Sequence, residues 1–179
     1  MDWVFAVERA YVAIATSGGP TIELQLGGES PQRLAAASGA VASRFLAVGS
    51  PRSVSLIVDD ETQHDFAQLS LEAHRTWFSP ADVRCTSAAL AARTGGRAVS
   101  VGEALAADIV CVHGRAIEIS AGALRRGTHV NVLGDPRCVD AELLALATVV
   151  DAASLPAMAA GFVDGRQLDE LTLFRYGVL

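Results

Sequence analysis

Three adjacent carboxylates mark the segment "SVSLIVDDETQHDF", residues 53–66. Asp59, Asp60 and Glu61 follow an apolar run typical of a buried strand, and they precede a segment with helical spacing of its apolar residues. In nucleotide-binding folds this strand-to-helix turn is rich in glycine, because backbone N–H groups must approach a phosphate closely. Carboxylates at such a turn could instead cap the helix, hold a hard divalent cation or attract an amine. The helix cap is the simplest of these interpretations.

Histidines supply the next candidates for chemistry. His113 lies in "DIVCVHG", at the carboxyl end of an apolar run, where ligands bind in open α/β sheets. It could act as an acid or a base near neutral pH, or it could be structural. Cys111 and His113 form a C-x-H pair without further matched ligands, so we expect no metal site. His64 and His74 lie ten residues apart on one predicted helix, and we expect both on the surface.

The composition excludes several classes of function. All 14 basic residues are arginine, which removes Schiff-base chemistry and a P-loop lysine. The formal charge of −6 argues against nucleic acid and anionic membrane as partners, because both need a basic face. No apolar run approaches the ~20 residues of a membrane span. The opening "MDWVFAVERAY" also lacks the basic region of a signal peptide.

The chain contains three widely spaced cysteines, Cys85, Cys111 and Cys138. An odd number at such spacings indicates reduced, mostly buried thiols rather than a disulfide framework. We therefore expect a cytoplasmic protein.

The elements that must position these residues alternate along the chain. Residues 9–28 read as a hairpin around a Gly-Gly-Pro turn, and residues 30–51 as a helix that ends before Pro51. Strands that are apolar on nearly every residue then alternate with helices, which is typical of a parallel sheet covered on both faces. The predicted fold class is α/β: a Rossmann-like parallel sheet flanked by helices, preceded by an N-terminal β-hairpin and helix.

Four segments carry a family likeness: "SPQRLAAASGAVASRFLA", "AADIVCVHG", "GTHVNVLGD" and "DELTLFRYG". In this order and with this spacing they resemble the ornithine cyclodeaminase/μ-crystallin family. The resemblance implies a Rossmann domain joined to a substrate and dimerisation domain, with NAD(P) as cofactor and small amino acids or imines as substrates. By this likeness, residues 1–50 are a remnant of the substrate and dimerisation domain, and residues 51–179 are the Rossmann-like domain.

The resemblance also assigns roles to individual residues. Asp135 matches the family's proton-transferring aspartate, although it could also cap a helix before Pro136. Together with the reading of the strand ends, it gives the positions predicted for cofactor binding: Arg33, Thr86, His113, Asn131 and Gly134.

Two departures from the family pattern concern the cofactor. Asp59 and Glu61 align with two of the glycines, so a side chain fills the space that the pyrophosphate needs and a carboxylate repels it. One carboxylate–phosphate pair at ~5 Å costs roughly 3 kcal/mol at an effective dielectric near 20, against ~0.3–2 kcal/mol from the helix terminus. The acidic residue expected at the end of the second strand is missing as well. Thr86 or Ser87, together with Arg84, could instead suit a 2′-phosphate.

These departures favour a degenerate relative of the family with impaired NAD(P) binding. The family's early segment with a substrate-binding arginine and a lysine has no counterpart in this chain. We therefore expect a non-catalytic binding or interaction protein that needs no cofactor. It would form a homodimer, or pair with another subunit, and could hold a small amino-acid-like ligand. The alternative is a divergent NAD(P)-dependent cyclodeaminase or imine reductase, which could require a partner subunit.

Overall fold

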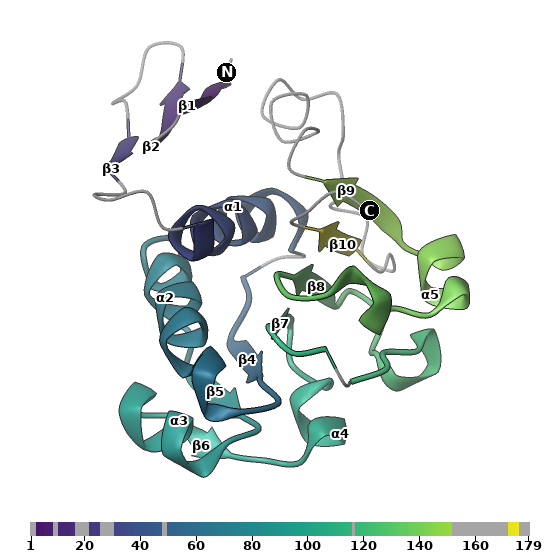
Figure 1. Cartoon of the computed structure of the whole chain (residues 1–179). Helices are drawn as coiled ribbons and strands as arrows, with labels where there is room; N and C mark the ends of the chain where they lie inside the picture. The colour runs from purple at the N-terminus through teal and green to yellow at the C-terminus, as the bar shows by residue number, and fades with distance from the viewer. Residues whose placement is uncertain are drawn as a thin grey trace.

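A parallel sheet forms the centre of the molecule (Figure 1). The computed structural model describes residues 3–8, 11–16, 22–25, 31–47, 50–115, 117–151 and 172–175. Within these residues the main sheet has seven strands in the order β6-β5-β4-β7-β8-β10-β9, and every neighbouring pair is parallel. The strands are β4 (Ser53–Ile57), β5 (Asp82–Cys85), β6 (Arg97–Ala98), β7 (Ile109–Val112), β8 (His129–Val132), β9 (Thr148–Asp151) and β10 (Thr172–Arg175).

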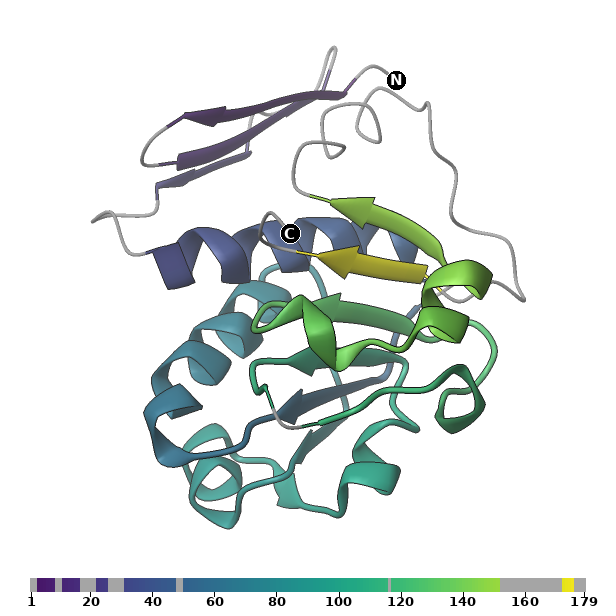
Figure 2. The same ribbon diagram turned by 45° about the vertical axis from the view of Figure 1, so that its right-hand side comes forward.

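Helices cover both faces of this sheet (Figure 2). The helices on one face are α1 (Pro31–Leu46), α2 (His64–Arg75) and α3 (Ala88–Thr94). The opposite face packs against α4 (Val101–Ala104), α5 (Ala141–Leu146) and the short 3₁₀ turns η2 (Ala121–Ala123) and η3 (Pro136–Cys138). A third 3₁₀ turn, η1 (Glu61–Gln63), leads into α2. Because both faces are covered, strand residues such as Leu56 and Ile57 are buried on opposite sides.

Small residues allow α1 to lie very close to the sheet. Residues 35–43 of this helix are all buried, as expected for a helix packed on more than one side. A Cβ at Gly39 would lie 3.0 Å from Leu133 Cδ2, tighter than nearly all real contacts. The alanine-rich sequence is therefore a packing requirement of this helix.

The N-terminal residues form a separate antiparallel sheet of β1 (Trp3–Glu8), β2 (Tyr11–Thr16) and β3 (Ile22–Gln25). The β2–β3 pair confirms the hairpin expected from the sequence, and β1 adds a strand that the pattern did not predict. In the described residues β2 contacts α1. The proposed boundary at residue 50 stays a prediction.

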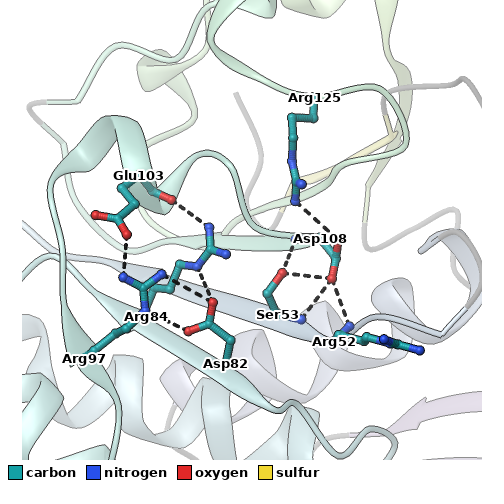
Figure 3. A network of polar contacts seen from close by, with 8 residues as sticks. All are labelled: Arg52, Ser53, Asp82, Arg84, Arg97, Glu103, Asp108 and Arg125. Atoms are coloured by element: carbon teal, nitrogen blue, oxygen red, sulfur yellow. Dashed lines mark hydrogen bonds and ion pairs between the residues drawn. The ribbon is translucent and has the colours of Figure 1, made fainter.

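One carboxylate ties together the amino ends of two central strands (Figure 3). Asp108, just before β7, accepts hydrogen bonds from the backbone N–H groups of Arg52 and Ser53 at 2.9 Å and from Ser53 Oγ at 2.8 Å. Arg125 adds an ion pair at 3.4 Å. These bonds hold the pKa of Asp108 below its usual value despite the opposing effect of burial. They fix β4 against β7 at the end opposite the candidate site.

The α/β Rossmann-like fold expected from the sequence is confirmed. Two strands depart from a simple alternation of strands and helices: β6 is only two residues long, and "TLFR" forms β10, which lies between β8 and β9. All three cysteines are buried and unpaired, as expected. Among the described helices, none is both long and apolar enough to cross a membrane.

Candidate functional site

The candidate site lies where the order of the sheet reverses. From β4 the chain moves outward through β5 and β6, then returns to β7 on the other side of β4. The carboxyl ends of β4 and β7 therefore border a crevice, the usual ligand position in open α/β sheets. A pocket of about 470 Å³ lies there. Its lining residues are Gln32, Asp59, Asp60, Thr62, Gln63, Phe66, His113, Arg115, Gly134 and Asp135.

The acidic turn after β4 is a helix cap, as the simplest interpretation held. Asp60 is extended and accepts hydrogen bonds from the Thr62 backbone N–H at 2.8 Å and the Thr62 hydroxyl at 2.5 Å. The hydroxyl bond is the main reason that the pKa of Asp60 is lowered. Gln63 Oε1 accepts from the Asp59 N–H at 2.8 Å, so two amides at this turn already have partners from the chain itself. Glu61 is exposed and does not line the pocket, so its part in the expected repulsion is smaller than the sequence suggested.

Asp59 crosses the crevice. Its carboxylate accepts a hydrogen bond from the backbone N–H of Arg115, in the loop after β7. The side chain passes over Gly114, where a Cβ would overlap the carboxylate. This contact joins residues 56 positions apart, which is why no local sequence pattern pointed to it.

Asp135, the predicted catalytic residue, lines the pocket but is held in an ion pair. The Arg137 guanidinium donates to both carboxylate oxygens at 2.5–3.0 Å, and the Arg137 backbone N–H donates to Oδ1 at 3.0 Å. The backbone bond caps η3, as the alternative interpretation proposed. These bonds, led by those from the Arg137 side chain, hold the pKa of Asp135 far below its usual range. To take up a proton near neutral pH, the carboxylate would first have to leave Arg137.

His113 also lines the pocket, but it faces the protein interior. Its side chain is buried, Nε2 lies 2.8 Å from Ser70 Oγ, and the ring packs edge-on against Phe66 at 4.8 Å. Nδ1 has no hydrogen-bond partner among the described residues. Burial lowers the pKa of His113 to about 3, so the ring is neutral near pH 7. In this state His113 is a structural neighbour of the pocket rather than a proton donor.

Asn131, predicted to bind cofactor, lies in the core and does not line the pocket. Its amide donates to Ser43 Oγ at 2.8 Å and lies 3.3 Å from His74 Nε2, while Oδ1 is 3.0 Å from His129 Nε2. Cys111 Sγ completes the group at 3.7 Å. In β8, Asn131 and His129 share the face under α1 and α2, because side chains alternate along a strand. The residue therefore joins helix and sheet.

The expectation that His64 and His74 lie on the surface is wrong, because both are buried. His74 Nδ1 is 2.6 Å from the Ser70 carbonyl and Nε2 is 2.9 Å from Ser43 Oγ. Desolvation lowers the pKa of His74 to about 4. Because α1 and α3 both contact α2, that helix buries more than one face, which a single apolar stripe did not reveal.

The other predicted cofactor residues are scattered. Arg33 is exposed on α1 and lines a separate hollow of about 230 Å³ between α1 and α2. Thr86 accepts from the Val58 N–H at 3.0 Å and donates to its carbonyl at 3.1 Å, which links the ends of β4 and β5. Gly134 lines the pocket, and a Cβ there would lie 2.9 Å from the Gly114 carbonyl oxygen.

The arginine proposed to receive a 2′-phosphate points elsewhere. Arg84 donates to Asp82 at 2.7 Å and to the carbonyl of Glu103 at 2.9 Å, while Arg97 bridges the Asp82 and Glu103 carboxylates (Figure 3). Ser87 caps α3. Both residues therefore have structural partners.

The sequence interpretation missed Gln63, Arg115 and Arg137. Two of these carried local signals: Gln63 follows the cap residue by three positions, as in a capping box, and Arg137 follows Asp135 by two. Arg115 carried none. In the described part of the chain, no group of three or more His, Cys, Asp or Glu residues is placed to hold a metal ion.

The fold resembles that of solved NAD-binding dehydrogenase-like proteins. No family model matches the chain, and a search of curated proteins found no significant match. Among solved structures, an archaeal alanine dehydrogenase dimer with bound NAD matches with a TM-score of 0.66 and 18% identity, over 98% of this chain and 79% of that one.

Two further solved structures share this fold. The Δ1-pyrroline-2-carboxylate reductase of Thermococcus litoralis, in complex with NADH and L-proline, has a TM-score of 0.63 and 19% identity over 94% of this chain and 66% of that one. A probable ornithine cyclodeaminase from Bordetella pertussis Tohama I has a TM-score of 0.62 and 18% identity over 94% and 68%. The chain thus spans roughly two thirds of the length of these two proteins. At such identities the likeness establishes the fold.

Proposed function

We propose that this chain keeps the fold of NAD-dependent cyclodeaminases and imine reductases but has impaired NAD(P) binding, and that it works as a non-catalytic binding or interaction protein. One observation carries the proposal: side chains of the chain itself occupy the turn where a pyrophosphate would bind. The Asp60 side chain accepts a hydrogen bond from the Thr62 backbone N–H, and the Gln63 side chain accepts one from the Asp59 backbone N–H. An incoming phosphate would have to displace these partners and would also meet two carboxylates, those of Asp59 and Asp60, that line the pocket.

The state of Asp135 supports the same proposal. A proton-transferring group works best with a pKa near the working pH. The ion pair with Arg137 instead lowers the pKa of Asp135, which takes it further from neutral pH. The pocket then serves as a binding site. A small amino-acid-like ligand suits it, because the pocket presents both carboxylates and Arg115.

The proposal is tested by titrating the purified protein with NAD(H) and NADP(H) while following its thermal unfolding. A cofactor at 100 times its Kd stabilises the folded state by about 2.7 kcal/mol, which would raise the Tm by about 5–10 °C in a chain of this size. We expect the Tm to rise by less than about 1 °C at millimolar cofactor, as for a protein that does not bind it. A saturable shift of several degrees would reject the proposal.

A divergent NAD(P)-dependent cyclodeaminase or imine reductase is the second candidate, favoured by the likeness to structures with bound NAD or NADH. In that case Asp135 would exchange Arg137 for substrate, and a partner subunit could supply missing groups. Turnover of NAD(P)H with a cyclic imine, lost in Asp135→Asn and kept in the control Glu61→Gln, which is exposed and outside the pocket, would establish it.

A homodimer is the assembly that we propose, with contacts through the N-terminal antiparallel sheet. Both outer strands of that sheet, β1 and β3, pair on one side only among the described residues, and free strand edges readily add partners. Light scattering coupled to size-exclusion chromatography should give twice the chain mass of 18.6 kDa. A monomer at all concentrations would reject this assembly.

A further inference from the structure

The crevice between β4 and β7 is crossed by a contact that leaves no room for a side chain at residue 114. The carboxylate of Asp59 accepts the N–H of Arg115 directly above Gly114. A Cβ at Gly114 would lie 2.5 Å from Asp59 Oδ2 and closer still to Oδ1 and Cγ, whereas real Cβ contacts stay above 3.0 Å. Among the described glycines, only Gly95 and Gly127 have positive φ, so the backbone of Gly114 would itself accept alanine. The absence of a side chain at residue 114 is therefore matched to Asp59.

A second glycine continues the same stack. A Cβ at Gly134, after β8, would lie 2.9 Å from the Gly114 carbonyl oxygen and closer to the His113 carbonyl. The loops after β4, β7 and β8 are thus packed in three layers: the Asp59 side chain, the Gly114 backbone and the Gly134 backbone. The carboxylate lies in the crevice where an external anion would otherwise meet the Arg115 N–H.

We propose that Asp59 is an internal latch, an autoinhibitory contact that occupies the anion position of the crevice and joins the loops after β4 and β7. The inference rests on the proposed function, because it names the contact that keeps a phosphate-bearing ligand out. Once the latch is removed, the Arg115 N–H and the nearby guanidinium become available to an anion. The ligand class for the opened crevice is a diphosphate group.

A double-mutant cycle tests the steric match, with Tm as the readout. Gly114→Ala should lower the Tm of the parent by about 5 °C or more, because the new Cβ expels the carboxylate. In an Asp59→Gly background the same substitution should lower the Tm by less than about 2 °C. Gly122→Ala is the matched control, since a Cβ at residue 122 would meet nothing within 4 Å. Equal losses from Gly114→Ala in both backgrounds would overturn the latch.

Inorganic pyrophosphate probes the opened crevice by calorimetric titration. We expect Asp59→Gly to bind pyrophosphate at least about ten-fold more tightly than the parent, which corresponds to 1.4 kcal/mol. Asp59→Asn, which keeps the side-chain shape, should change in the same direction. Glu61→Gly makes the same charge change on the same turn but outside the pocket, and it should behave like the parent. Equal gains in Asp59→Gly and Glu61→Gly, or no gain in either Asp59 variant, would overturn the latch.

Different experimental results would reject the proposed function and the latch. NAD(H) binding by the parent protein would reject the proposed function and leave the Gly114–Asp59 coupling intact. An additive cycle in a parent that binds no NAD(H) would reject the latch alone.

Discussion

Replacing Asn131 by alanine should destabilise the protein rather than change its ligand binding. The side chain is fully buried, donates to Ser43 Oγ at 2.8 Å and accepts from His129 at 3.0 Å. Alanine would remove the Asn131 acceptor of His129 Nε2–H and the amide donor to Ser43 Oγ. One buried orphan group costs about 1–3 kcal/mol, and the lost side-chain volume adds to that. We expect a total of about 2–4 kcal/mol, or a Tm lower by about 5–15 °C.

Urea denaturation followed by far-UV circular dichroism measures this change as a shift in midpoint at constant slope. Gln32→Ala is the matched control, because Gln32 is exposed and lines the pocket; its midpoint should not move. An Asn131→Ala protein with a stability change below about 0.5 kcal/mol and altered ligand binding would refute the assignment of Asn131 to the core.

Three further predictions concern titration and the amino ends of the strands. The pKa values of three buried histidines are depressed from 6.5: His74 to about 4, and His113 and His129 to about 3. As the pH falls, histidines of the unfolded chain bind protons at a higher pH than the buried histidines of the folded protein. The contribution of these histidines to the free energy of unfolding should therefore be fully present above pH ~6.5 and decrease toward pH ~4, by up to about 1.4 kcal/mol per pH unit and histidine. Urea midpoints measured across this pH range test the prediction. Arg137→Ala should raise the pKa of Asp135 toward its ordinary value, as measured by carboxyl NMR titration, because Arg137 supplies the bonds that lower it. Asp108→Ala should destabilise the fold by about 1–2 kcal/mol in urea unfolding, because two backbone N–H groups lose their acceptor, whereas Ser53→Ala should cost less.

The sequence predicted the fold well because its signals are local. Uninterrupted apolar runs mark strands covered on both faces, and the helix ends carry recognisable caps, such as Ser87 before α3 and Gly95, in the left-handed conformation, after it. The pairing of β2 with β3 and the alanine-rich helix were equally predictable. Strands with weak local signals were the hardest to predict. β6 has only two residues, and β10 is defined by its pairing with β8 on one side and β9 on the other.

The candidate site was less predictable, because its decisive contacts join distant residues. In a strand buried on both sides, the sequence cannot say which face carries a ligand and which carries a helix. Asn131 therefore looked like a cofactor ligand although it lies beneath α1. His74 looked exposed because its partners, Ser43 and Asn131, belong to other elements. The Asp59–Arg115 contact could not be read from either segment alone.

The position of β10 has a consequence for biosynthesis. This strand, Thr172–Arg175, lies between β8 and β9, and β9 pairs with no other described strand. During translation β9 is synthesised before β10. The backbone N–H and C=O groups of β9 that pair with β10 therefore have no strand partner until residues 172–175 have been synthesised. A nascent chain stalled before that point would present the open edges of two strands, the form in which chaperones would meet it.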